Sequence, residues 1–316
     1  MFRFIPIIYI FNFIVCFYLV LTTKNQYPKT MILRKLAETL IVLLLIVFPF
    51  FIGISIAGHT PYTDGNSFWK YVFLWGGISI GIALILMLLL KYFYRSFEQP
   101  LLGAAILLLM ASPIIGIVGL AAPPDLSINM LDHPEREHLR YLILSLGALL
   151  FAVFLLLAFK RNLVQPKGNL RLIIIVLSFL CIAEFAWEFS HHYLYPEGLQ
   201  AWMNQGSKAE DFGKHYDNVS FINVGVIGRY IQFSLILWLS FQLYKWRHIR
   251  IWNPIIISFF CMMGLISATV VFITEFNLPK GYEFLLAFFI PGMPFLLLYW
   301  IGIALLTGYK IQRKDL

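Results

Sequence analysis

Four side chains that can bind protons or metal ions lie within or beside one apolar segment. Glu184 lies 12 residues after Leu172, where the segment begins, and Glu188, His191 and His192 follow it. At about 100° per residue these four side chains share one helical face. A charge at membrane depth costs several kcal/mol unless it is paired or hydrated, so such residues mark sites. The pattern predicts a polar site inside a membrane span.

A later apolar segment carries a single cation, Arg229, near its middle. With a rise of ~1.5 Å per residue, Glu184 lies ~12 Å and Arg229 ~15 Å below the predicted outer boundary. We therefore predict that Arg229 faces Glu184, Glu188 or both, and that Gly225, one turn away, leaves room for the guanidinium. Such a cluster would either fix the register of two helices or form an anion site or proton path.

These residue types support two kinds of chemistry. Glu184 and Glu188 are candidate catalytic acids or bases, and Arg229 is a candidate catalytic residue that would hold an anionic group. Glu188 and His191 have the i, i+3 spacing by which a carboxylate and an imidazole bind one ion in helical bundles, with His192 beside them. The cofactor would then be a divalent metal ion such as iron, zinc, manganese or copper.

A second pair, Glu135 and His138, has the same spacing at the start of an earlier apolar segment. Asp132 and Pro134 precede this pair, and that arrangement is also typical of a capped helix N-terminus. We expect capping to account for Asp132 and Glu135, with metal binding by Glu135 and His138 as the alternative. Five further residues that could bind a metal lie on the same predicted side of the membrane: His59, Asp64, His133, His215 and Asp217. For His59, Asp64, His215 and Asp217 we expect an ordinary solvated loop.

Composition decides the class of protein. Of 316 residues, 60% are hydrophobic and 13% are charged, and the mean hydropathy is +0.80. These values indicate a polytopic membrane protein and not a soluble domain. The net charge of +8 does not indicate a nucleic-acid partner, because its distribution along the chain follows membrane topology. Each of the three cysteines lies in an apolar segment, which argues against a disulfide framework.

The predicted fold is an all-α, polytopic transmembrane bundle of nine spans, each long enough to cross ~30 Å of hydrocarbon. Residues 1–30 form an N-terminal transmembrane segment that is alternatively an upstream extension or an uncleaved signal-like anchor. Residues 31–316 form a single integral membrane domain with eight spans. The nine spans are residues 4–21, 36–57, 69–90, 100–121, 139–159, 171–192, 219–243, 252–274 and 284–308.

The distribution of charge predicts the orientation. The connections after the first, third, fifth and seventh spans, with the C-terminal tail, hold 16 Lys or Arg and three acidic residues. The opposite connections, with the extreme N-terminus, hold seven Lys or Arg and 11 acidic residues. By the positive-inside rule the N-terminus lies outside and the C-terminus is cytoplasmic, in a bacterial-type inner (plasma) membrane. The external segment 196–218 would form either an ordinary solvated loop or a lid over the site.

Three functions remain open at this point. The first is a membrane-embedded enzyme or ligand-binding protein with an outward-facing site for a lipidic or small anionic substrate, with or without a metal ion. The second is a proton- or ion-coupled transporter in which Glu184 and Arg229 pair and unpair. The third is a non-catalytic membrane subunit or assembly factor held together by the same pair. Membrane lipids are expected partners in each case, and the sequence leaves the oligomeric state open.

Overall fold

The computed structural model describes residues 128–132 and 134–308 and the isolated positions 40 and 43. Every regular element in these residues is helical, which confirms the predicted all-α class for this part of the chain. The chain divides into two compact units, Met1–Phe48 and Pro49–Leu316, and the elements described below belong to the second. The first four predicted spans, and with them residues 1–30, lie outside the described residues.

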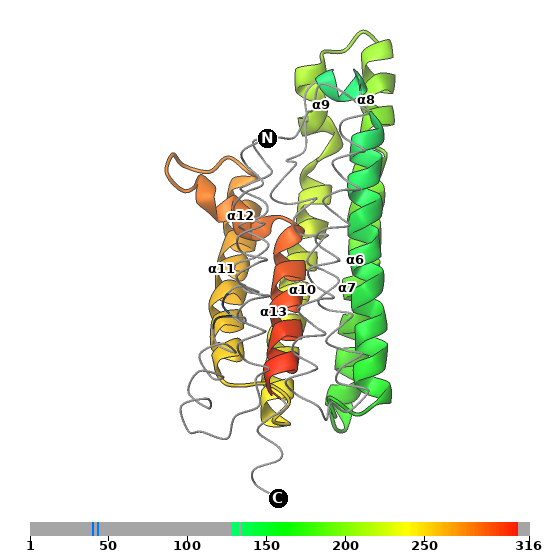
Figure 1. The fold of residues 1–316 in the computed structure, drawn as a ribbon. Coiled ribbons are helices and arrows are strands. Elements are labelled where there is room, and N and C mark those ends of the chain that lie inside the picture. The colour runs from blue at the N-terminus through cyan, green and yellow to red at the C-terminus, as the bar shows by residue number, and fades with distance from the viewer. Residues whose placement is uncertain (1–39, 41–42, 44–127, 133, 309–316) are drawn as a thin grey trace, which may run out of the picture. The chain divides into compact units, whose positions relative to one another are not determined.

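Four long helices match four predicted spans, and each is long and apolar enough to cross a membrane. They begin and end close to the predicted boundaries, and Figure 1 shows them running side by side. They are α6 (Pro134–Lys160), α7 (Asn169–Tyr193), α10 (Val219–Lys245) and α11 (Trp252–Thr274).

The fifth predicted span in this region, residues 284–308, is broken. It consists of η3 (Glu283–Leu285), α12 (Leu286–Phe289) and α13 (Gly292–Gly308), and its two halves meet at 61°. Ile290 has a ψ of 146° because a proline disfavours helical geometry in the residue before it, and that proline is Pro291. The predicted span 284–308 is thus formed by helices that meet at an angle.

The segment between α7 and α10 forms two short helices, α8 (Tyr195–Asn204) and α9 (Ala209–Tyr216). With η2 (Ile128–Asp132) they enclose a small apolar core, and we call these three elements the cap (Figure 1). Pro196 lies in the first turn of α8, where its missing N–H costs nothing. The cap core consists of Met130, Tyr195, Leu199 and Phe212.

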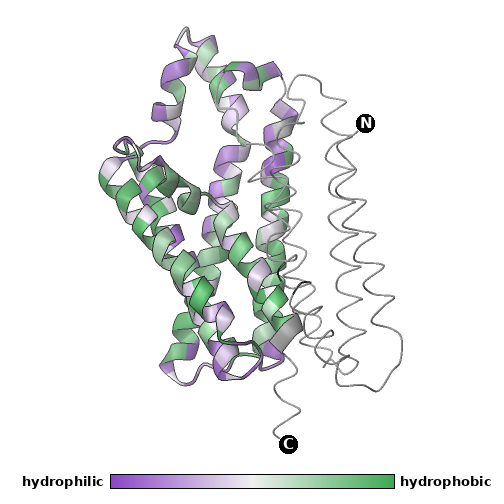
Figure 2. Ribbon diagram, turned by 60° about the vertical axis from the view of Figure 1, so that its left-hand side comes forward, coloured by the Kyte–Doolittle hydropathy of each residue, from purple (hydrophilic) through white to green (hydrophobic). Residues whose placement is uncertain are grey.

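Helix α10 packs against α7, α11 and α13, and α6 packs against α7 and α13. The helices are hydrophobic along most of their length and hydrophilic towards their ends (Figure 2). Some of their largest apolar side chains point outward, among them Leu156, Phe179 and Ile273, which are 70%, 71% and 73% exposed. Outward-facing apolar side chains of this kind suit contact with lipid and not with water. This part of the chain therefore has the character of a membrane protein.

Candidate functional site

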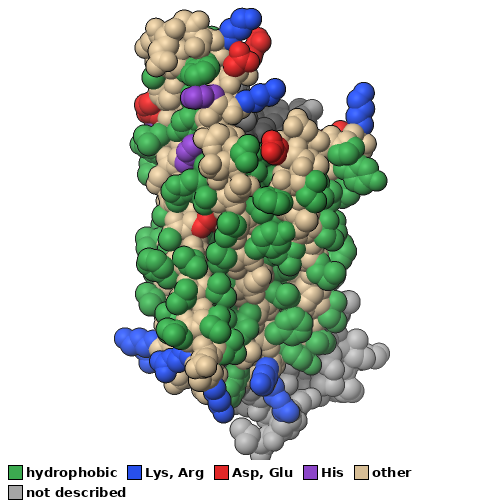
Figure 3. Space-filling view, turned by 180° about the vertical axis from the view of Figure 1, so that it is seen from behind, with side chains coloured by type: hydrophobic (Ala, Val, Ile, Leu, Met, Phe, Trp, Pro, Cys, Tyr) green, Lys and Arg blue, Asp and Glu red, His purple; other side chains and the backbone are tan. Residues whose placement is uncertain are grey.

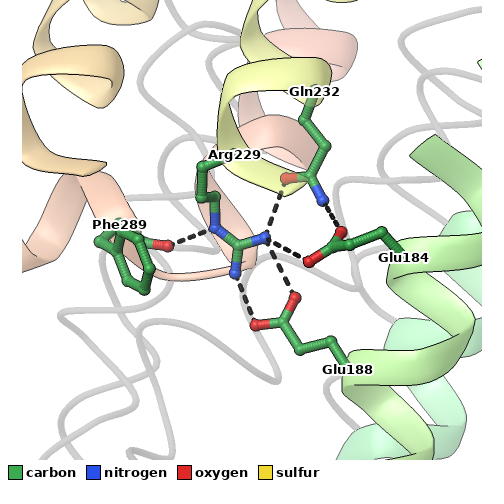
Figure 4. Close-up of polar contacts among 5 residues, drawn as sticks. All are labelled: Glu184, Glu188, Arg229, Gln232 and Phe289. Carbon is green, nitrogen blue, oxygen red and sulfur yellow. Dashed lines mark hydrogen bonds and ion pairs between the residues drawn. The ribbon is translucent and has the colours of Figure 1, made fainter. Parts of the chain in front are cut away.

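Arg229 is fully buried between α10 and its neighbours, and it faces both acidic residues of α7 (Figure 4). Its Nη1 and Nη2 donate to the two carboxylate oxygens of Glu188, over 3.0 and 2.6 Å. Nη1 also lies 3.8 Å from Oε1 of Glu184. The predicted pairing of Arg229 with Glu184 and Glu188 is thus confirmed, and the strong, two-pronged bond is to Glu188.

Gln232 completes the contact between α7 and α10. It lies one turn after Arg229, it is fully buried, and its Oε1 accepts a hydrogen bond from Nη1 of Arg229 at 2.9 Å. Its Nε2 donates to Oε2 of Glu184. The sequence places Gln232 on the face of Arg229, but only the structure gives it this bridging role. We refer to Glu184, Glu188, Arg229 and Gln232 as the polar network.

The backbone of the broken span also binds Arg229. Nε of Arg229 donates to the carbonyl of Phe289 at 2.6 Å, and the guanidinium carbon lies 5.3 Å from the centre of the Phe289 ring. In a continuous helix that carbonyl would accept from the N–H of Met293, which instead donates to Ile290. Arg229 thus satisfies a carbonyl that the break at Pro291 has left free. Sequence reasoning missed this contact, although Pro291 signals a freed carbonyl nearby.

The glycine that makes room for the polar network is Gly228 and not Gly225. A Cβ atom at Gly228 would overlap the carboxyl group of Glu184. At Gly225 the nearest atom to such a Cβ would be Cζ of Phe289, at an ordinary contact distance of 3.9 Å. The prediction that Gly225 makes room for the guanidinium is corrected accordingly, since it is Glu184 that needs the space.

The polar network has more acid than base. Among the residues that the structure describes, Oε1 of Glu184 is buried without a hydrogen-bond partner. Four of the five N–H groups of Arg229 are already used by Glu188, Gln232 and Phe289. With both carboxyls ionised the network carries one net negative charge, and one added proton removes it.

The two histidines at the C-terminal end of α7 lie among aromatic rings. Nε2 of His191 lies 3.1 Å from Oδ1 of Asp217, and the His191 ring is 3.9 Å from that of Phe221. The hydroxyl of Tyr216 donates to the His191 carbonyl at 2.9 Å. Burial and the nearby negative charges of Asp217 and Glu197 raise the pKa of Tyr216.

His192 lies in a different environment from His191, between aromatic rings of α6 and α10. Its ring stacks on Tyr141 of α6 at 5.2 Å and meets Phe221 edge to face at 5.2 Å. His192 therefore packs α7 against α6 and α10, and none of its described contacts is that of a metal ligand.

The structure gives no support to the predicted metal sites. In residues 128–132 and 134–308, no three His, Cys, Asp or Glu side chains lie close enough together to hold a metal ion. Arg229 occupies both oxygens of Glu188, and Asp217 faces His191, so the predicted ligands have other partners.

In the second predicted pair, the described contacts of His138 are with other residues than Glu135. His138 lies 2.9 Å from Glu197 of α8 and stacks on Tyr193, while Glu135 lies in the first turn of α6, as expected for a helix N-terminus. Of the other candidate ligands, His215 stacks on Trp202 within the cap. His59, Asp64 and His133 lie outside the described residues.

No protein-family model matches the chain, and no curated protein or solved structure was found to be similar to it. The argument for function therefore depends on the polar network itself.

Proposed function

We propose that this multi-pass membrane protein is a proton-coupled transporter in which the polar network binds the proton. The observation that supports this most is the excess carboxyl: two buried acids share one guanidinium, and one oxygen of Glu184 has no hydrogen-bond partner among the described residues. A proton on Glu184 would neutralise the network and weaken its attraction to Arg229. Glu184 would then exchange the proton while Glu188 keeps Arg229 in place.

The broken span supports a transporter over a static bundle. Transporters commonly carry discontinuous helices whose freed backbone groups lie beside the ion site. Here the freed carbonyl of Phe289 binds Arg229 directly, so a change in the charge around Arg229 acts on α12. The polar network would thereby couple proton binding to a movement of the broken span.

The same contacts argue against Arg229 as the binding site for an anionic substrate. A guanidinium that recognises an anion needs at least two free N–H groups for a two-pronged bond, and Arg229 retains one. A membrane-embedded enzyme for a lipidic or small anionic substrate is therefore the weaker proposal.

The proposed orientation follows the charges at the helix ends. We propose that the α6–α7 and α10–α11 turns are cytoplasmic and the cap is external, in a bacterial-type inner membrane. Both turns lie at one end of the described helices, and all seven of their charged residues are Lys or Arg (Figure 3). In this orientation the site formed by Glu184 and Arg229 would face the outer side of the membrane.

Proton binding and proton movement can be measured separately. Infrared difference spectra of the purified protein at two pH values report the C=O stretch of a protonated carboxyl. Vesicles with an entrapped pH dye report proton uptake under an imposed membrane potential. We expect Glu184→Gln to remove both the pH-dependent carboxyl band and the proton uptake.

Glu275→Gln is the matched control, because Glu275 is an exposed carboxyl that follows α11 and lies outside the network. It should leave both signals unchanged. A wild-type protein that shows the carboxyl band without proton uptake would exclude transport and favour a non-catalytic membrane subunit. If Glu184→Gln kept both the carboxyl band and the proton uptake, the assignment of the proton to Glu184 would be overturned.

A further inference from the structure

Helices α6 and α10 finish at the same end of the described bundle with the same backbone turn (Figure 1). After α6 the left-handed residue is Asn162, with a φ of 55°, and after α10 it is Arg247, with a φ of 58°. In each case the next N–H donates to the carbonyl five residues earlier, which defines a Schellman turn. These bonds run from Leu163 to Ala158 at 2.9 Å and from His248 to Leu243 at 2.8 Å.

Apolar side chains anchor both turns to the bundle. Leu163 and Val164 are 4% and 2% exposed after α6, and Ile249 is 1% exposed after α10. With the backbone closed and the apolar side chains buried, the charged side chains are left on the outside. All seven basic residues of these turns are exposed: Lys160, Arg161, Lys167, Arg171, Lys245, Arg247 and Arg250. We call these seven residues the basic turn surface.

The segments of sequence that form the basic turn surface contain no acidic residues. The chain contains no Asp or Glu between Glu137 and Glu184, or between Asp217 and Glu275. Lys160 and Lys245 end their helices, where a cation complements the helix dipole. That effect applies to two of the seven basic residues.

With the described helices across a membrane, the basic turn surface would lie at the level of lipid headgroups. It begins where the apolar part of the helices ends, and Figure 3 shows Lys and Arg side chains beyond a belt of hydrophobic ones. Tyr244 and Trp246, on the α10 turn, are 40% and 37% exposed. Tyrosine and tryptophan are enriched where hydrocarbon meets the headgroups.

We propose that the basic turn surface binds the headgroups of anionic phospholipids in the adjoining leaflet. Each Lys or Arg near an anionic membrane surface adds to the attraction, which decays within a Debye length of about 10 Å. Because the Schellman turns fix the backbone beforehand, little ordering is needed when a headgroup binds. This inference requires only that the described helices span the membrane and is independent of proton binding at Glu184.

The experiment uses the full chain in vesicles of phosphatidylcholine with a minor share of phosphatidylglycerol. Spin-labelled phosphatidylglycerol and phosphatidylcholine are added in turn, and the fraction of each lipid immobilised by the protein is measured. We expect the wild type to prefer phosphatidylglycerol, and 0.5 M NaCl to weaken that preference by screening. The triple variant K160Q/R161Q/K167Q should lower the preference at least ~threefold, since each charge contributes separately.

The control removes three charges from the opposite end of the helices. Lys208, Lys214 and Lys280 are exposed residues of the cap and of the α11–η3 loop, and K208Q/K214Q/K280Q should leave the preference unchanged. An equal loss in both triple variants would show a response to net charge alone and would overturn the proposal. The proposal would also be overturned if the wild type showed no preference for phosphatidylglycerol at low salt. Glu184→Gln should keep the lipid preference, so failure of the proton proposal leaves this one intact.

Discussion

The carboxyl group of Glu184 on α7 lies against the backbone of Gly228 on α10, at a place that a Cβ atom would occupy. The close approach of the two helices here lets Gln232 reach Glu184 and lets Arg229 reach Glu188. A glycine with no side chain is thus a condition for the polar network.

Gly228→Ala should therefore lower the free energy of unfolding by about 1–3 kcal/mol, the usual cost of an overpacked interior. The alanine methyl group would displace Glu184 and break its bond to Gln232. Thermal unfolding in detergent measures the loss of stability, and the carboxyl band in the infrared spectrum reports the displaced Glu184.

Gly225→Ala is the matched control, since it makes the same change one turn away on α10. There the new methyl group would lie 3.9 Å from the nearest atom. Both variants gain the same helix propensity, about 1 kcal/mol over glycine. The difference between them therefore isolates the contact with Glu184, and equal stabilities would contradict the role given to Gly228.

Replacing the two glutamates should have unequal effects. Glu188 makes the two-pronged bond to Arg229, whereas Glu184 lies 3.8 Å from it. Removing one partner of a buried ion pair costs about 3–5 kcal/mol, and in Glu188→Gln the Nη groups of Arg229 would lose the ionised carboxylate that they bind. We expect a loss in that range for Glu188→Gln and a clearly smaller one for Glu184→Gln, measured by thermal unfolding.

A double-mutant cycle checks the pairing. Arg229→Met leaves two acids without their cation and should be at least as damaging as Glu188→Gln. The double variant E188Q/R229M should be less destabilised than the sum of the single variants, because it removes both charges together. Additive losses would mean that Glu188 and Arg229 do not act as a pair.

Removing the proline at the break should change the geometry of the last span. In Pro291→Ala the backbone N–H is restored and the preceding residue can become helical, so α12 and α13 can join. Joining them would withdraw the Phe289 carbonyl from Arg229. Spin labels at the exposed positions Phe284 and Ile255 should report a changed distance by pulsed electron resonance.

Pro254→Ala serves as the proline control. Pro254 lies in the first turn of α11, where no backbone hydrogen bond is lost to it. The distance between the two labels should stay as in the wild type. An unchanged distance in Pro291→Ala as well would show that packing, and not the proline, maintains the 61° bend.

The cap should lose stability in alkaline solution through Tyr216. Burial raises the pKa of Tyr216 in the folded protein, while in the unfolded chain it ionises near its ordinary pKa of about 10. Above that pH the unfolded chain loses the proton first, so this stabilising contribution is present at lower pH and declines as pH rises. Hydrogen exchange of α8 and α9, measured from pH 8 to 11, should show the decline.

Tyr216→Phe tests that assignment. It removes the hydrogen bond to the His191 carbonyl, at a cost of about 1 kcal/mol near neutral pH, and it should flatten the alkaline decline. Tyr282→Phe changes an exposed tyrosine on the α11–η3 loop. It should neither lower the stability near neutral pH nor flatten the alkaline decline. A decline that persists unchanged in Tyr216→Phe would assign the alkaline effect to another group.

The sequence was enough to predict the helices that carry the polar network and the positions of its residues along them. The lengths of apolar segments and the constant rise of a helix place Glu184 and Arg229 at similar depths. The same periodicity puts Glu188 and Gln232 on the faces of those two residues. The metal site was misjudged because i, i+3 spacing describes one helix only, and the partners of Glu188 and His191 come from other elements.

The sequence by itself determined the helical class, the four long apolar helices and the depths of their charges, because these depend on local composition and on the geometry of one helix. Only the tertiary structure decided which atoms meet. The rotation of α7 against α10 selected Gly228 and not Gly225 as the point of contact. The break before Pro291 freed the Phe289 carbonyl, and the donor that binds it, Arg229, lies 60 residues away in the chain. Contacts of that kind depend on how separate helices pack, which no local pattern specifies.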